Sequence, residues 1–437
     1  MTATTIQVHP NITFELIQLS LPPFPSHMAS LMRRISWPFR SWKPIVFSNS
    51  NFPRIPSDER IEEETLPDYR PSRYYPVHVG EVLRDRYQVV GKLGFGATST
   101  VWLARDLSGR RHVALKLFVN SESMGRQLDN ELNTYKRMKE RGSGNHPGRA
   151  VVRELLDSFD IEGPDGQHRC LVHPPLFESV LTFLRRNPVE RLPAPILAVV
   201  LHRLFLALDF LHRECAIIHT DIKADNIMFG IADDSVFSDF EQQEQRDPSP
   251  RKVLDDRTIY ISRELDMPKR LGAPVLCDFG SAVFGDEEHQ EDVQPNVYRA
   301  PEVILRAPWS YKIDIWNAGC MVWDLFEGGH LFTGQDPELH TYRSRAHLSE
   351  MVALLGQPPQ QLLNRGRLTS KFFSDKGEFC GGISLPAPIS LEEIETNLKG
   401  HDKESFLRMM RMMLQWEPNL RSSARELAES EWLQEQM

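Results

Sequence analysis

Two short segments constrain this chain more than any other feature: HTDIKADN, which begins at residue 219, and DFG, which begins at residue 278. The first contains a carboxylate, a lysine and an amide at fixed spacing (Asp221, Lys223 and Asn226), and the second adds a carboxylate, Asp278. Phosphoryl transfer needs a carboxylate that orients the attacking hydroxyl, a cation beside the transferring oxygens, and oxygen ligands for Mg²⁺. We therefore expect a phosphoryl-transfer site with Asp221 and Lys223 as catalytic residues and Asn226 and Asp278 as ligands of Mg²⁺.

Three more segments follow the order and spacing of one known family. They are the glycine-rich LGFGATSTV from residue 93, the strand-like VALK that ends at Lys116, and YRAPE, which ends at Glu302 and is followed by Asp314 and Arg421. Together, the five segments resemble the eukaryotic protein kinases over most of the chain. The resemblance implies an α+β, bilobal protein kinase fold, with a β-rich small lobe that has one key helix and a mostly α-helical large lobe. It also implies structural roles: Glu302 pairs with Arg421, and Asp314 anchors the backbone of the catalytic loop.

The resemblance also implies where ATP binds. Lys116 would pair with the α- and β-phosphates, and the partner of Lys116 would be Glu131 rather than Glu122, because Glu131 lies beside a stripe of apolar residues with helical spacing. A solvated surface glutamate is the alternative interpretation of Glu131. The expected ATP-binding residues are Leu93, Gly94, Gly96, Ser99, Val101, Ala114, Lys116, Glu131, His173 and Leu176.

Two positions in this set depart from the usual kinase pattern. Ser99 replaces the third glycine of the glycine-rich loop. The hinge contains two prolines, which have no backbone N–H to donate. If His173 is the gatekeeper, adenine would be held by the carbonyl of Pro174 and the N–H of Leu176, so the prolines would remove no needed donor.

Composition fits a soluble two-lobed domain with additions. The formal net charge of −9 argues against direct nucleic-acid binding, and the absence of an apolar run of about eighteen residues argues against a membrane span. Five scattered cysteines suggest reduced thiols without structural zinc, and a monomer is the expectation for the family. The expected division is a leader (1–57), an extension packed on the small lobe (58–86), and a kinase domain (87–437) with a small lobe (87–173), a large lobe (174–437) and an insertion (230–272).

Two of these parts leave alternatives open. From Met28 to Trp42 the leader is basic, serine-containing and aromatic, as a mitochondrial presequence is; the alternative is a disordered leader, including one that precedes a true start at Met28. The enzyme is therefore expected in the cytoplasm or nucleus, or in mitochondria through residues 1–57. The acidic insertion is interpreted as a solvated surface segment, with a regulatory or docking role as the alternative.

The segment from Val283 to Val297 contains no Ser, Thr or Tyr and thus no internal site for an activating phosphate. The arginine that reads such a phosphate in other kinases is replaced by Thr220, so we expect an enzyme that is active as made. Five carboxylates in this segment would attract cationic peptides, unless they are merely solvated. They are Asp286, Glu287, Glu288, Glu291 and Asp292.

These features, with Arg299 before Ala-Pro-Glu and the late KFFSDKG, resemble the SR-protein kinases of the CMGC group, and most of all their short fungal forms. The resemblance implies a serine/threonine protein kinase that transfers the γ-phosphate of ATP to serine in basic, Arg-Ser-type protein substrates, with a role in mRNA processing. Arg343 and Arg345 stand where the docking helix of that family is acidic, and would repel such a substrate. The alternative is a pseudokinase, an ATP-binding scaffold without turnover, which the retained lysine and aspartates disfavour.

Overall fold

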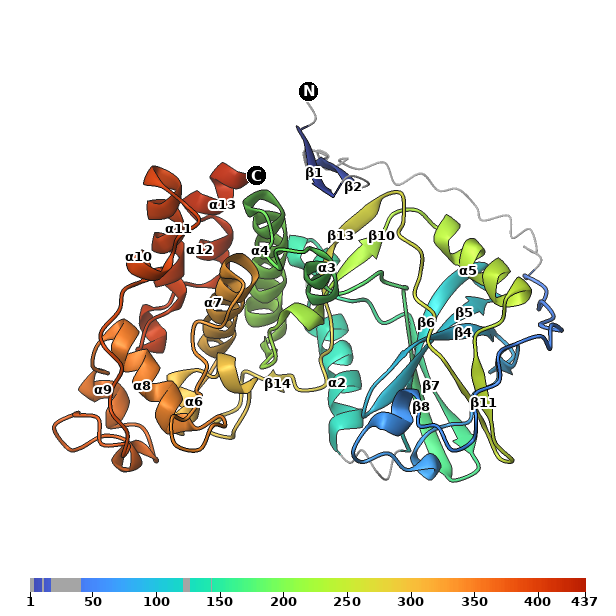
Figure 1. The fold of residues 1–437 in the computed structure, drawn as a ribbon, viewed down its shortest axis with the longest axis horizontal. Coiled ribbons are helices and arrows are strands. Elements are labelled where there is room, and N and C mark those ends of the chain that lie inside the picture. The colour runs from blue at the N-terminus through green and yellow to red at the C-terminus, as the bar shows by residue number, and fades with distance from the viewer. Residues whose placement is uncertain (1–3, 10–11, 17–40, 121–125, 143) are drawn as a thin grey trace.

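The computed structural model describes residues 4–9, 12–16, 41–120, 126–142 and 144–437, and it confirms the expected α+β fold with two lobes (Figure 1). The small lobe contains a six-stranded antiparallel sheet in the order β3-β4-β5-β6-β8-β7. Its strands are Val82–Leu83 (β3), Tyr87–Phe95 (β4), Ser99–Asp106 (β5), Arg111–Phe118 (β6), Asp157–Gly163 (β7) and Gly166–His173 (β8). Because successive side chains of a strand point to opposite faces, Val90 and Leu103 join the core shared with the large lobe, whereas Val89 and Trp102 join a second core.

Helix α2 (Arg126–Arg141) lies between this sheet and the large lobe (Figure 1). The large lobe is mainly helical and is built around the largely buried α4 and α7. Its helices are α3 (Val180–Arg186), α4 (Ala194–Asp209), α6 (Pro301–Ile304), α7 (Lys312–Glu327), α8 (Ser344–Leu355), α9 (Gln360–Leu363), α10 (Leu391–Ile394), α11 (Gly400–Met413), α12 (Ala424–Ala428) and α13 (Glu431–Gln436). Among the described residues, the helical stretch Ala194–Cys215 has the length and composition of a membrane span, but it is a core helix here, with 67% of its most apolar window buried.

Short strand pairs complete the fold. In the large lobe, β9 (Ile217–Ile218) pairs with β14 (Val283–Phe284), and β10 (Ile227–Ile231) pairs with β13 (Leu271–Leu276). The insertion between β10 and β13 contributes α5 (Ser235–Arg246) and the hairpin of β11 (Arg251–Val253) and β12 (Thr258–Tyr260). At the N-terminus, β1 (Thr4–His9) and β2 (Ile12–Leu16) form a separate hairpin.

The solvated interpretation of the insertion is wrong for α5, which lies beside β4 and β5 of the small lobe (Figure 1). The apolar side chains of Val236, Phe237 and Phe240 follow one face of α5 and are all buried. Phe240 packs so closely on β4 that a Cβ added at Gly91 would lie 2.8 Å from its ring. The acidic composition of the insertion led to the solvated interpretation, although an apolar helix face of this kind needs a partner that buries it.

Buried contacts of one lysine join the sheet both to the segment that precedes it and to the insertion. Lys92 of β4 is 1% exposed, and its ammonium group contacts Glu63 and lies 3.3 Å from Glu62, while it also donates to the carbonyl of Tyr260 at 3.2 Å. Buried charges of this kind are tolerated when they are paired and hydrogen-bonded. The N-terminal extension, the sheet and the insertion therefore form one interlocked layer.

Residues 41–57, which we assigned to the leader, run along the small lobe. The N–H of Trp42 donates to the carbonyl of Leu107 at 2.8 Å, and the guanidinium of Arg105 lies 4.7 Å from the Trp42 ring centroid. Arg105 also donates to the carbonyl of Lys43 at 2.8 Å. Apart from its last two residues, the presequence-like stretch 28–42 lies outside the described residues, so its targeting role stays a prediction.

Candidate active site

The catalytic loop lies between β9 and β10 and brings the three predicted residues together. Lys223 Nζ is 2.9 Å from Asp221 Oδ2, and the Asn226 amide donates to the same oxygen at 2.9 Å and to the Asp221 carbonyl at 2.8 Å. The Asn226 amide nitrogen is thus used to position Asp221, which leaves the amide oxygen of Asn226 as the atom for a metal. The arrangement holds a carboxylate and a cation side by side in the partly exposed site.

Asp314 of α7 fixes the backbone of this loop. Its carboxylate is fully buried and accepts hydrogen bonds from the N–H groups of His219 and Thr220, both at 2.8 Å, and it lies 2.9 Å from Nε2 of His212. Thr220 needs this support because its φ of +66° is costly for a β-branched residue. Asp314 therefore occupies the anchoring position that the sequence predicts for it.

Lys116 and Asp278 meet where the phosphates are expected. Lys116 Nζ is 2.8 Å from Glu131 Oε2 and 3.4 Å from Asp278 Oδ1, while Glu122 lies outside the described residues. The nearby Lys116 ammonium lowers the pKa of Asp278, so this carboxylate is ionised at neutral pH. Asp278 adopts a φ of +61°, a strained backbone of the kind that persists at functional sites. A carboxylate from Asp278 and an amide oxygen from Asn226 are hard oxygen donors of the type that Mg²⁺ prefers.

Four aromatic and imidazole rings contact one another in succession across the site. The centroid of Phe279 lies 5.3 Å from that of His219 and 5.4 Å from that of Tyr135 in α2. The Tyr135 ring is in turn 5.5 Å from that of His173 at the end of β8. This packing couples the position of α2 to the catalytic loop and to the DFG segment.

The nucleotide-binding side is formed by β4, β5 and the hinge. The turn after β4 is closed by a hydrogen bond from the N–H of Gly96 to the carbonyl of Ser99 at 2.8 Å, and a Cβ at Gly94 would meet no atom within 4 Å. The open space beside Gly94 gives a phosphate room to approach the backbone. Tyr74 of the N-terminal extension supports this turn, since its hydroxyl donates to the Gly96 carbonyl at 3.2 Å.

The predicted hinge residues directly follow β8. His173 is the last residue of β8 and pairs with Ala114 of β6, so the hinge begins directly after this pair. Within the described residues, neither the carbonyl of Pro174 nor the N–H of Leu176 takes part in a hydrogen bond, and both remain available to adenine. Leu93 is partly buried.

In the sheet, Val101 of β5 lies opposite Lys116 of β6. In the large lobe, Arg421 and Glu302 form a bidentate pair with distances of 2.5 and 2.7 Å, and both side chains are at most 1% exposed. Arg421 also donates to the carbonyls of Lys312 and Gln415. The pair thus ties the end of the activation segment to the C-terminal part of the chain.

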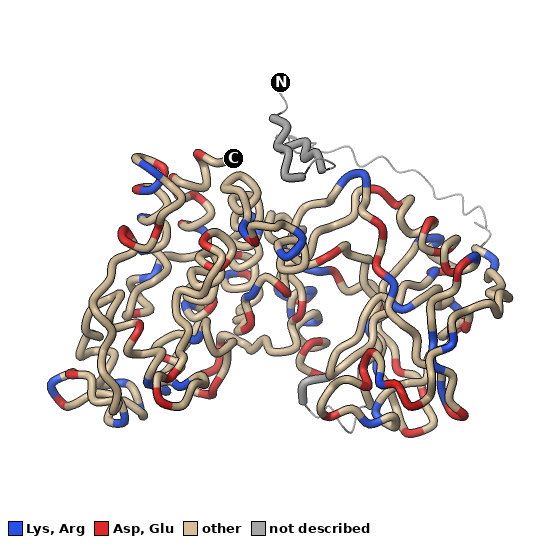
Figure 2. Tube along the Cα trace, in the orientation of Figure 1, with Lys and Arg blue, Asp and Glu red and all other residues tan. Residues whose placement is uncertain are grey.

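Three of the five carboxylates of the activation segment form ion pairs. Asp286 pairs with Arg137 of α2, Glu291 with His289, and Asp292 with Arg299. Within the described chain, the exposed side chains of Glu287 and Glu288 make no ion pair. The expectation of a cationic-peptide surface therefore rests on these two glutamates, and Figure 2 shows acidic and basic residues interspersed over both lobes.

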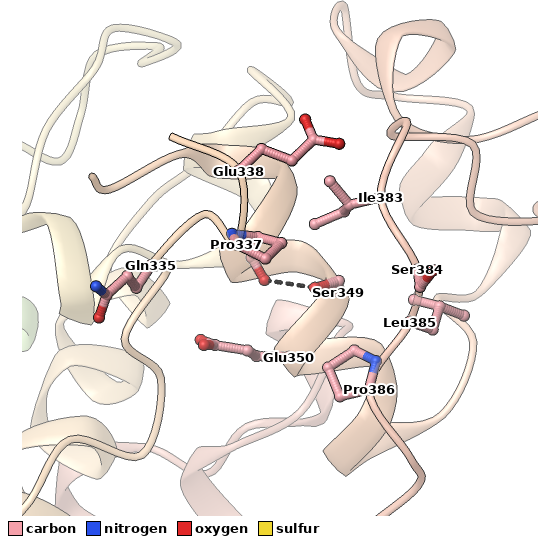
Figure 3. A pocket seen from close by; sticks show the side chains of 10 residues that line it. Gln335, Pro337, Glu338, Ser349, Glu350, Ile383, Ser384, Leu385 and Pro386 are labelled. Carbon is pink, nitrogen blue, oxygen red and sulfur yellow. Dashed lines mark hydrogen bonds between the residues drawn. The ribbon is translucent and has the colours of Figure 1, made fainter. Parts of the chain in front are cut away.

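A hollow of about 480 Å³ lies beside α8, where we expected the docking region (Figure 3). Arg345 does not project a free charge into it, because its guanidinium pairs with Asp336 at 2.5 Å and with Glu338 at 2.6 Å. Hydrogen bonding from Arg345 lowers the pKa of Asp336 to about 2. Arg343 is exposed. The hollow is lined by both polar and apolar side chains, those of Gln335, Pro337, Glu338, Ala346, Ser349, Glu350, Ile383, Ser384, Leu385 and Pro386.

Several functional contacts were not predicted from the sequence. The hydroxyl of Thr220 donates to the carbonyl of Ser281 at 2.8 Å, which ties the catalytic loop to the activation segment. Asn130 of α2 donates to the carbonyls of Gly280 and Ala282 at 2.9 and 2.6 Å. The only sequence signal was that Asn130 precedes Glu131 on the same predicted helix; its partners lie 150 and 152 residues away.

Comparison with known proteins agrees with this geometry. Residues 87–433 match the protein kinase domain family. A serine/threonine protein kinase of Aspergillus fumigatus is 42% identical over 390 residues, which covers 88% of this chain and 93% of that protein. The serine/threonine-protein kinase SRPK of Physarum polycephalum is 30% identical over 395 residues (85% and 91%), and protein kinase dsk1 of Schizosaccharomyces pombe is 26% identical over 469 residues (86% and 86%). The chain therefore belongs to the serine/threonine protein kinases, in their SR-protein-kinase-like (CMGC) branch.

Proposed function

We propose that this kinase transfers the γ-phosphate of Mg²⁺-bound ATP to serine in basic, Arg-Ser-type protein substrates. The observation that carries the substrate class is the pair of exposed carboxylates on the activation segment, Glu287 and Glu288, which make no ion pair with any described residue. Carboxylates at this place favour a cationic peptide and disfavour an acidic one. The similarity to relatives that are named SRPK and SRSF protein kinase supports the same class and suggests a role in mRNA processing.

The chemistry follows from the residues already in contact. Asp221 would orient the serine hydroxyl and accept its proton, and Lys223 would stabilise the negative charge of the γ-phosphoryl group. Lys116, held by Glu131, would position the α- and β-phosphates. Asn226 and Asp278 would hold Mg²⁺, which neutralises charge on the phosphates when it is bound. Transfer would be direct, without a covalent enzyme intermediate.

Substrate recognition would be concentrated near the catalytic residues. In the hollow beside α8, Asp336 and Glu338 are paired with Arg345, and Glu350 accepts hydrogen bonds from Thr333 and Gly334. Few carboxylates there remain for peptide arginines. We therefore expect the enzyme to recognise the residues that flank each target serine, with little gain in affinity from a longer Arg-Ser repeat.

The test is a radiolabelled-ATP assay of the full chain with an Arg-Ser repeat peptide, its Lys-Ser counterpart and an acidic serine peptide. Asp221→Ala is the control for contaminating activity. Preference for the Arg-Ser peptide, weakened in a Glu287→Gln/Glu288→Gln variant, would support the proposal. Equal use of all three peptides would refute the substrate class, and ATP binding without transfer to any peptide would favour the pseudokinase.

Activity should not require phosphorylation of the activation segment. Residues 283–297 contain no hydroxyl side chain, and Thr220 replaces the arginine that reads a phosphate. Enzyme treated with a protein phosphatase should thus keep its kcat. Loss of activity on dephosphorylation, restored by an upstream kinase, would contradict this expectation. A location in the cytoplasm or nucleus is proposed, with import into mitochondria through residues 1–57 as the alternative.

A further inference from the structure

The path of the activation segment is fixed where it leaves the DFG motif. Strand β14 pairs with β9, and the next N–H, that of Gly285, donates to the carbonyl of Ala216 at 2.8 Å. A Cβ at Gly285 would lie 2.3 Å from the ring of Tyr311, so only glycine fits this close approach. Asp286 therefore emerges at a defined position beside the strand that leads into the catalytic loop.

Two arginines at the C-terminal end of α2 meet Asp286 there. Arg137 Nη2 is 2.5 Å and Arg141 Nη2 is 3.3 Å from Asp286 Oδ2. Arg137 is the more constrained of the two, because its side chain is only 13% exposed against 49% for Arg141. It also donates from Nε to the carbonyl of Cys215 at 2.8 Å, and its guanidinium lies 4.2 Å from the ring centroid of Phe284.

These contacts act on the helix that positions ATP. Glu131 of α2 pairs with Lys116, and Tyr135 of α2 contacts the ring of Phe279. A shift of α2 would therefore disturb both the ion pair with Lys116 and the ring contacts. Asn130 holds the same face of the helix near its other end. Without Arg137 and Asp286, the C-terminal half of α2 would lose its charged contact with the activation segment.

We propose that Asp286 is a positioning residue that holds α2 in its catalytic position through Arg137 and Arg141, as a phosphate does in kinases whose activation segment must be phosphorylated. A carboxylate has less charge than a phosphate, but it is present from synthesis. The Asp286 carboxylate accepts a charge-assisted hydrogen bond from Arg137 and forms an ion pair with Arg141. The inference rests on the kinase activity of the chain and not on the choice of Arg-Ser substrates.

The experiment compares the full-length enzyme with Asp286→Asn, which keeps the shape of the side chain but removes its charge. The conservative Asp286→Glu is the rescue variant. Glu140→Gln is the matched control, because Glu140 is an exposed carboxylate on the same helix and makes no ion pair within the described residues. The readouts are kcat, the KM values for peptide and ATP, and hydrogen exchange of the α2 amides in the enzyme without substrate.

We expect Asp286→Asn to lower kcat about tenfold, the scale of one charge-assisted hydrogen bond, while KM for the peptide changes less than about twofold. Amides of α2 should exchange faster in Asp286→Asn, whereas Asp286→Glu and Glu140→Gln should resemble the wild type in both readouts. Faster exchange with a lower kcat would support the proposal.

Two results would overturn it. If Asp286→Asn raises the KM for cationic peptides and leaves kcat and the exchange of α2 unchanged, Asp286 contacts substrate and does not position the helix. If exchange of α2 in Asp286→Asn equals that in Glu140→Gln, the helix is held without this carboxylate. Because the exchange measurement needs no substrate, it separates failure of this inference from failure of the Arg-Ser proposal.

Discussion

The packing of Phe240 on Gly91 gives a quantitative test of how the insertion is attached. Phe240 belongs to the insertion of the large lobe, is 2% exposed, and fills the space above a glycine of the small-lobe sheet. Phe240→Ala should cost about 3–5 kcal/mol, because it removes a buried ring and leaves a cavity. Gly91→Ala should cost about 1–3 kcal/mol, because the new methyl group would lie 2.8 Å from the ring and force it to move.

The two costs should not add. When Phe240 is already alanine, the methyl group of an alanine at Gly91 has free space and fills part of the cavity. We expect the double variant to be about 1–3 kcal/mol more stable than the sum of the single effects, as is found for residues in direct contact. Native-state hydrogen exchange of the β4 and β5 amides measures this locally, which avoids the assumption that both lobes unfold together.

Val253→Ala is the matched control for this cycle, since Val253 belongs to the same insertion but is 48% exposed. It should change the protection of β4 and β5 by no more than about 0.5 kcal/mol. Additive effects of Phe240→Ala and Gly91→Ala, or an effect of Phe240→Ala as small as that of Val253→Ala, would refute the view that the insertion stabilises the small-lobe sheet.

Three further outcomes are expected. Asp278→Asn should lower kcat in the peptide assay about 10³-fold or more, since a bound metal supplies several kcal/mol of transition-state stabilisation; near-normal turnover would rule out Asp278 as a ligand. Arg421→Met should leave the buried Glu302 carboxylate unpaired and lower stability by about 3–5 kcal/mol, seen as a lower urea midpoint that an added Glu302→Gln partly restores. Burial lowers the pKa of His347 to about 3 from 6.5, so His347 contributes stability that is fully present above pH 6.5 and is lost as the pH falls towards 3. His347→Phe should weaken this acid dependence of the urea midpoint.

The contacts among the proposed catalytic residues were predictable because their geometry is largely local. Asn226 reaches Asp221 across five residues of one loop, so a motif of eight residues already contains the contact. Glu131 was distinguishable from Glu122 because the apolar stripe of a helix defines which face is buried. Such features depend on spacing along the chain, which the sequence displays directly.

The contacts of the insertion were not predictable in this way. Composition makes it acidic, yet Glu244 is buried, with hydrogen bonds to Ser249 and an ion pair with Arg251 at 3.2 Å. Whether a charged residue lies inside or outside depends on a partner, and the decisive surface, around Gly91 on β4, is separated from Phe240 by more than a hundred residues. The acidic composition favoured a solvated interpretation, and the apolar spacing in α5 does not by itself identify a partner that would bury that face.

Thr220 and Asp286 are best understood together, because both hold the activation segment in place. An arginine at position 220 would need a phosphate on the activation segment as its partner, and residues 283–297 contain no hydroxyl side chain that could carry one. Thr220 instead donates to the carbonyl of Ser281 and joins the catalytic loop to the start of the activation segment, while Asp286 joins the next part of the segment to α2 through Arg137. The segment is thus held from both sides by groups that are present as soon as the chain folds. A threonine in place of the arginine is therefore compatible with catalysis because the ordering that the arginine would supply comes from these two contacts.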